Sequence, residues 1–138
     1  MKKPKVLPAE VVDMLMPRLS DEFNASYFYR SLSHWCQGSG YKIAAEYFAK
    51  ESADELTHAA KLEKFLVDWN VAIQLPPIPS PVYEFSSLAE GIGNAYGIEY
   101  KLYEDYEDTS LKLFKIDLCA FDLLQFFRDV QVKSVAEY

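Results

Sequence analysis

Cysteine, glycine and long apolar runs are all scarce in this sequence of 138 residues. No apolar run approaches the roughly 18 residues that a membrane-spanning helix needs, so we expect no membrane partner. The opening stretch MKKPKVLPAE has lysines but no apolar segment behind them and does not predict a secretory signal, which favours a cytoplasmic location. Cys36 and Cys119 have no paired or metal-like spacing, and we expect both to be buried, reduced thiols.

Positive charge is also in short supply. The chain has 14 lysines and arginines against 21 aspartates and glutamates, a formal net charge of -7. An acidic surface repels phosphate backbones and anionic membranes, so we expect no nucleic-acid partner, and metal cations are the more natural charged partner. The composition, 50% hydrophobic and 25% charged, is ordinary for a folded chain, and the length suits a single domain over residues 1–138.

The positions of glycine and proline divide the first half of the chain into two helices and a linker. Neither residue type interrupts residues 19–36 or residues 41–70, so each of these segments predicts a helix. Residues 71–86 can form neither a helix nor a central strand, because this segment holds Pro76, Pro77, Pro79 and Pro81.

Capping signals predict two more helices. Ser86 or Ser87, with Glu90 three residues after Ser87, can start a third helix that runs to about Lys115. Asp117 can cap a fourth helix directly after it. Short turns join antiparallel neighbours. Roughly 15 extended residues span about 50 Å, which exceeds the length of a long helix, so the proline-rich linker can run the length of the bundle. The prediction is an all-α four-helix bundle with one long crossover between the second and third helices.

Ionisable residues occupy positions where a helical bundle has its core. Inward positions repeat at alternating spacings of three and four residues. On the second helix they are Phe48, Glu51, Glu55, His58, Leu62, Phe65 and Trp69. On the third they are Leu88, Ile92, Ala95, Glu99, Leu102, Tyr106, Thr109 and Leu113. The first helix gives Leu15, Leu19, Glu22, Ser26, Tyr29 and Ser33, and the fourth gives Phe121, Leu124, Phe127 and Gln131.

Buried carboxylates of this kind need a counter-charge. Unpaired burial of a carboxylate is costly, and facing carboxylates repel one another. Two divalent ions would supply four positive charges against the three negative charges of Glu22, Glu55 and Glu99. His58, three residues after Glu55 on the same helix face, would add a neutral nitrogen donor. Oxygen donors with an imidazole suit iron or manganese better than a thiolate-rich zinc site.

Four stretches of the chain resemble bacterial non-haem ferritins. In family-like order, they are DEFNASYFYRSLSHWC, AKESADELTHAAKLEKFL, SPVYEFSSLAE and FDLLQFFRDVQ. The resemblance implies a ferroxidase centre in which Glu22 and His58 bind one iron and Glu55 bridges to the other. It also implies that Glu99 binds the second iron, with Gln131 near it.

Departures from related families narrow this interpretation. Bacterioferritins bind haem through a methionine where this chain has Leu56, so we expect no haem. Their second Glu-x-x-His on the fourth helix is replaced here by Gln131 and Ser134. A third iron site is expected to be missing or degraded, because Asp54 remains but the matching positions on the fourth helix are Val130, Lys133 and Ser134. We also expect the fifth short helix of typical ferritins to be absent.

Three residues near the site keep alternative interpretations. Tyr29 lies two helical turns from Glu22 and either hydrogen-bonds a ligand, delivers an electron to the oxidised centre, or is only a packed aromatic. Gln131 is either a ligand or a core amide that completes hydrogen bonds. Glu51, one turn from Glu55, either guides iron inward or belongs to a solvated helix end.

The resemblance implies oxidation of Fe(II) to Fe(III) by O2 or H2O2 and storage of the ferric mineral in a homo-oligomeric shell, of 24 subunits by family likeness. Two other hypotheses remain open. One is a di-iron oxidase or peroxide-detoxifying protein that stores no mineral. The other is a helical assembly protein whose site has become structural.

Overall fold

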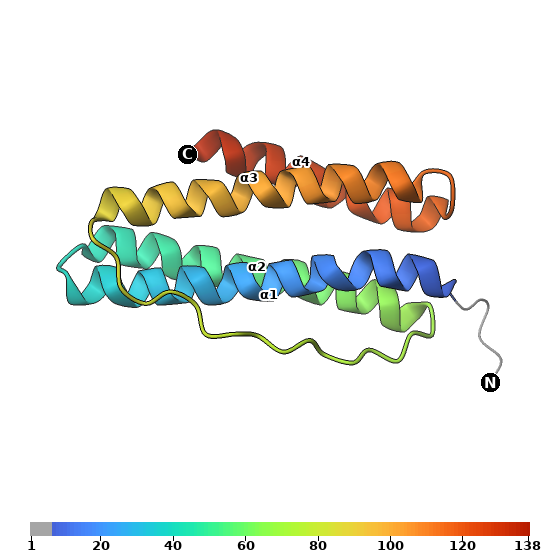
Figure 1. Cartoon of the computed structure of the whole chain (residues 1–138), viewed down its shortest axis with the longest axis horizontal. Coiled ribbons are helices and arrows are strands. Elements are labelled where there is room, and N and C mark those ends of the chain that lie inside the picture. The colour runs from blue at the N-terminus through green and yellow to red at the C-terminus, as the bar shows by residue number, and fades with distance from the viewer. Residues whose placement is uncertain (1–6) are drawn as a thin grey trace.

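A computed structural model describes residues 7–138, which form four α-helices. They are α1 (Ala9–Gly38), α2 (Lys42–Asp68), α3 (Leu88–Leu113) and α4 (Leu118–Glu137). The helices α1 and α2 form one antiparallel hairpin, α3 and α4 form a second, and the extended crossover runs back along the first hairpin (Figure 1). The predicted all-α bundle with one crossover is therefore confirmed. Part of the stretch examined for a secretory signal, residues 1–6, lies outside the described residues.

The predicted caps start both helices of the second hairpin. The hydroxyl of Ser87 accepts a hydrogen bond from the backbone N–H of Glu90 at 3.1 Å, and the Glu90 carboxylate accepts one from the backbone N–H of Ser86. The carboxylate of Asp117 accepts a hydrogen bond from the backbone N–H of Ala120 at 2.9 Å. These bonds satisfy N–H groups that have no partner within the helix itself.

Helix α1 begins ten residues earlier than predicted and contains Pro17. Proline lacks the N–H that would bond one turn back and disfavours a helix interior. Pro17 is exposed, so the carbonyl that loses its partner lies on the solvent side of the helix. Val11 and Leu15 are fully buried and continue the apolar stripe towards the N-terminus, which favours the helix despite the proline.

The core of α2 is rotated from the predicted stripe. Phe48, Glu55 and Leu62 are buried as predicted. The other buried positions of this helix are Ala45, Ser52, Ala59 and Leu66, in place of Glu51, His58, Phe65 and Trp69, which are only partly buried. Glu51 and His58 therefore lie at the edge of the buried stripe. On α1, all six predicted inward positions are buried.

The prediction that Ile92 faces the core is wrong, since its side chain is 39% exposed. The cause is the length of α4, which has 20 residues against 26 in α3 and ends before it reaches the start of α3 (Figure 1). Ile92 instead lines an apolar groove beside the end of α4, together with Leu88 and Tyr138.

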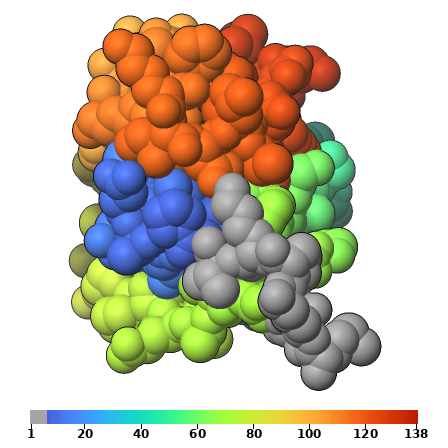
Figure 2. Space-filling view, turned by 90° about the vertical axis from the view of Figure 1, so that its right-hand side faces the viewer, coloured from blue at the N-terminus to red at the C-terminus, as the bar shows by residue number. Residues whose placement is uncertain are grey.

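The prediction that both cysteines are buried is wrong for one of them. Cys36 is buried, but Cys119, in the first turn of α4, is exposed. Figure 2 views the end of the bundle where the α3–α4 turn, the start of α1 and the beginning of the crossover lie together. None of the helices in residues 7–138 combines the length and apolarity that crossing a bilayer demands.

Candidate metal centre

Four of the residues singled out by the sequence meet in the middle of the bundle. Glu22 comes from α1, Glu55 and His58 come from α2, and Glu99 comes from α3. Glu22 and Glu99 are fully buried, Glu55 is 2% exposed, and the His58 side chain is 13% exposed. The two hairpins thus bring three carboxyl groups and one imidazole out of water and towards one another.

Glu22, Glu55 and His58 form the first donor group. One ligand atom from each lies within 4.8 Å of the others. The Nδ1 atom of His58 is 3.5 Å from Oε2 of Glu22 and 3.5 Å from Oε2 of Glu55, longer than a well-formed N–H···O bond. Within residues 7–138 none of these three buried atoms has a hydrogen-bond partner. Buried polar atoms without partners are rare and call for an explanation such as a bound ion.

A second donor group shares Glu55 with the first. Ligand atoms of Glu51, Glu55 and Glu99 lie within 4.8 Å of one another. A carboxylate has two oxygens and can face two cations at once. The carboxyl group of Glu55 is therefore shared by two groups that could each hold a metal ion. Oxygen donors with one imidazole nitrogen suit hard or borderline divalent ions such as iron and manganese.

Tyr29 and Gln131 both hydrogen-bond Glu99. The Tyr29 hydroxyl donates to Oε1 of Glu99 at 2.5 Å, and the Gln131 amide donates to Oε2 at 2.8 Å and to the Glu99 backbone carbonyl at 3.1 Å. Bonds to both oxygens fix the orientation of this carboxyl group. Of the interpretations left open by the sequence, the structure gives Tyr29 a hydrogen-bonding contact with Glu99 and Gln131 a contact through its amide N–H2.

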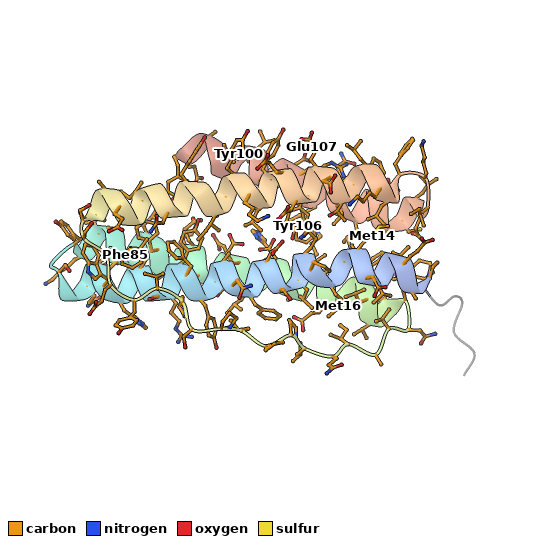
Figure 3. The ribbon with its side chains drawn as sticks, in the orientation of Figure 1. Met14, Met16, Phe85, Tyr100, Tyr106 and Glu107 are labelled. Carbon is orange, nitrogen blue, oxygen red and sulfur yellow. The ribbon has the colours of Figure 1, made fainter. Side chains whose placement is uncertain are left out.

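Tyr106 makes a matching contact with Glu22 that sequence analysis missed. Its hydroxyl donates to Oε1 of Glu22 at 2.6 Å, and its ring stacks on Phe127 with centroids 4.9 Å apart. Figure 3 shows Tyr106 pointing from α3 into the space between the two hairpins. A signal existed, because Tyr106 lies seven residues after Glu99 and therefore on the same helix face.

The shared surroundings shift the pKa values of the first group in different directions. Burial would raise the pKa of Glu22, but its interactions with Glu55 and His58 outweigh burial and lower it. Burial and the neighbouring Glu22 raise the pKa of Glu55 well above its ordinary value. Burial would lower the pKa of His58, but the carboxyl groups of Glu22 and Glu55 raise it to about 10. At neutral pH the metal-free group therefore holds a proton on His58.

The second group has raised pKa values throughout. Burial raises the pKa of Glu99, and the hydrogen bonds from Tyr29 and Gln131 offset only part of this effect. Burial also raises the pKa of Glu51, to about 7, with further contributions from the negative charges of Glu137 and Glu99. Raised values of this kind mark carboxyl groups that lack a counter-charge.

Asp54 belongs to neither donor group. Its carboxylate pairs instead with Lys50 at 3.7 Å, and both side chains are exposed. Asp54 therefore offers a charged neighbour on α2 that lies outside the centre.

Comparisons with known proteins agree with this architecture. The model of the ferritin-like domain family matches residues 12–138. A probable bacterial non-heme ferritin-like protein of Haemophilus influenzae is 28% identical over 127 residues, which cover 91% of this chain and 77% of the relative. A bacterial non-heme ferritin of Staphylococcus saprophyticus is 25% identical over 137 residues, which cover 96% of this chain and 80% of the relative.

Solved structures show the same fold. An open pore ferritin from the archaeon Archaeoglobus fulgidus superposes with a TM-score of 0.91 at 20% identity, covering 95% of this chain and 80% of that chain. A humanized archaeal ferritin gives the same TM-score at 21% identity. Because the family model matches nearly the whole chain, this protein belongs to the ferritin-like domain family.

Proposed function

We propose that this protein oxidises ferrous ions at a di-iron site and stores the ferric product. The observation that carries the proposal is the convergence of three buried atoms without partners, Oε2 of Glu22, Oε2 of Glu55 and Nδ1 of His58. A simple core would not retain them, because each costs free energy unless it is bonded. A divalent cation among them would satisfy all three at once.

The chemistry follows from the donor types. Ferrous iron is the substrate: Glu22 and His58 would hold one ion, Glu99 the other, and the shared Glu55 would bridge them. Two ferrous ions give up two electrons, and one O2 or H2O2 accepts them together with two protons. Carboxylates stabilise the higher charge of the ferric product and can change between terminal and bridging modes. Gln131 would serve by holding Glu99, since its amide already donates to that carboxyl.

Tyr29 has two roles in this proposal. Its hydroxyl orients Glu99 through a bond of 2.5 Å. A phenol in contact with a ligand is also placed to donate an electron to the oxidised centre. The ring of Tyr29 is fully buried and stacks on Phe48 with centroids 5.9 Å apart, which keeps water away from it.

The proposals on iron storage, assembly and location rest on similarity to related proteins. Relatives of this chain are named bacterial non-heme ferritins. We propose by this likeness that residues 1–138 act as one domain in a homo-oligomeric shell of about 24 subunits, located in the cytoplasm. The acidic surface would attract ferrous ions to such a shell.

Aerobic addition of Fe(II) tests the proposal. We expect rapid formation of ferric iron, monitored by absorbance, and uptake of many more than two irons per chain into a particle measured by light scattering. Saturation at two irons per chain would instead indicate a di-iron oxidase without storage. An absence of oxidation would leave only a structural site.

Variants on α2 supply the controls. Glu55→Ala should abolish the fast oxidation, because both donor groups lose their shared ligand. Glu46→Gln removes an exposed charge from the same helix and should oxidise iron at the rate of the unmodified protein. Equal rates in the Glu55→Ala variant and the unmodified protein would refute the site assignment.

A further inference from the structure

Glu51 is the donor that the sequence pattern did not assign. It lies one helical turn before Glu55 on α2, so the two side chains share a face of the helix. One of its carboxylate oxygens lies within 4.8 Å of ligand atoms of Glu55 and Glu99. Residues 7–138 offer its side chain no hydrogen-bond or ion-pair partner. Glu51 therefore extends towards the centre without a partner of its own.

The second ion position is short of donors without Glu51. Glu99 and the shared Glu55 are the other carboxyl groups at this position. Gln131 of α4 already directs its amide N–H2 group to Glu99. The same face of α4 carries no acidic residue one turn later, where Val135 follows. Glu137, at the end of α4, accepts a hydrogen bond from the Tyr47 hydroxyl at 3.0 Å and belongs to neither donor group. Glu51 of α2 is therefore the carboxylate placed to supply a third protein oxygen at this position.

The charge balance of the centre also favours Glu51 as a ligand. Glu22, Glu55 and Glu99 supply three negative charges, one fewer than the four positive charges of two divalent ions. Adding Glu51 brings the sum to zero in a buried setting where an unbalanced charge is costly. Glu55, which is 2% exposed and belongs to both donor groups, is the most deeply buried carboxylate of α2.

From these contacts we infer that Glu51 is the third carboxylate ligand of the second ion, supplied by α2. The inference rests on the proposed di-iron function. The helix α2 then contributes three ligands at spacings of four and three residues: Glu51 to the second ion, Glu55 to both, and His58 to the first. Glu51 is partly exposed, so one ligand of this ion position is in contact with solvent.

Zinc binding tests the inference without iron chemistry, because Zn2+ is not redox-active. Isothermal titration calorimetry of the unmodified chain should give two Zn2+ per chain. In Glu51→Gln the first ion should bind as before, and the second should bind at least about tenfold more weakly. Crystals soaked in Zn2+ should show two anomalous peaks, the second within about 2.2 Å of a Glu51 oxygen.

Asp54→Asn is the matched control. It removes the same charge from the same helix, but Asp54 belongs to neither donor group. Both ions should bind this variant within about twofold of the unmodified chain; an equal loss in the two variants would reduce Glu51 to a general electrostatic effect and overturn the inference. Unchanged binding of the second ion in Glu51→Gln, or a second peak without a Glu51 oxygen, would also overturn it. If the unmodified chain binds no pair of ions, the proposed function itself fails.

Discussion

Filling the first donor group with Zn2+ should release protons at pH 7. The Glu22 and Glu55 carboxyl groups raise the pKa of His58 to about 10 against the opposing effect of burial, so the metal-free imidazole is protonated. Burial and Glu22 also raise the pKa of Glu55 well above its ordinary value. A metal ion binds the neutral imidazole and the ionised carboxylate, so its binding displaces the proton of His58 and opposes protonation of Glu55. We expect at least one proton per Zn2+, released by His58, and the raised pKa of Glu55 favours further release.

Calorimetry in two buffers of different ionisation enthalpy counts these protons. The apparent affinity should also rise about tenfold per pH unit for each proton released. The stability of the metal-free protein should instead fall as the pH rises. The stabilising contribution of His58 is complete below its unfolded pKa of about 6.5 and is lost as the pH rises through about 10. Identical binding enthalpies in both buffers, after correction for dilution, would show a neutral His58 and refute this account.

Three further variants test the structure around the centre. Tyr106→Phe keeps the ring but removes the hydroxyl that donates to Glu22, so the free energy of unfolding in urea should fall by about 1.5–3 kcal/mol; no change would contradict that bond. Pro17→Ala restores a helical N–H at an exposed position and should raise the free energy of unfolding by about 1–3 kcal/mol. A decrease would show that the proline stabilises the fold. Asp117→Ala removes the cap of α4 and should cost about 0.5–2 kcal/mol while the Ala120 amide exchanges faster; unchanged exchange would argue against the cap.

The bundle and the meeting of most of the candidate donors could be predicted because burial leaves a regular trace in the sequence. An ionisable residue in the middle of an apolar stripe is visible as an exception, as Glu99 is on α3. Helix ends were visible where one side chain makes the cap, as Asp117 does. Both signals are local, so a single sequence is sufficient to find them.

The rotation of α2 could not be predicted in the same way. An alternation of three and four residues fits two stripes that share Phe48, Glu55 and Leu62, and the spacing alone does not choose between them. Packing against α1 chooses the one with Ser52, whose hydroxyl donates to the backbone carbonyl of Ser26 at 2.8 Å. This contact joins residues 26 positions apart and has no local trace. The edge position of Glu51 and its open access to the centre follow from that packing.

The two hairpins meet through the side chains of the candidate metal centre. Tyr29 on α1 donates to Glu99 on α3, and Tyr106 on α3 donates to Glu22 on α1. The two bonds run in opposite directions between the hairpins, so neither carboxyl group is oriented until the hairpins have docked. Docking therefore assembles the site, and the same phenols that hold the hairpins together offset part of the cost of burying the carboxylates.

The two proposed ion positions would then have different mechanical roles. The first donor group lies within the α1–α2 hairpin, so an ion there joins two helices that already pack along their length. The second reaches from α2 to Glu99 on α3, so an ion there ties one hairpin to the other. Because ligand binding stabilises whichever contact it requires, loss of the second ion should weaken the docking of the hairpins more than the pairing of α1 with α2. The chemistry of the centre and the cohesion of the bundle thus depend on the same carboxyl groups.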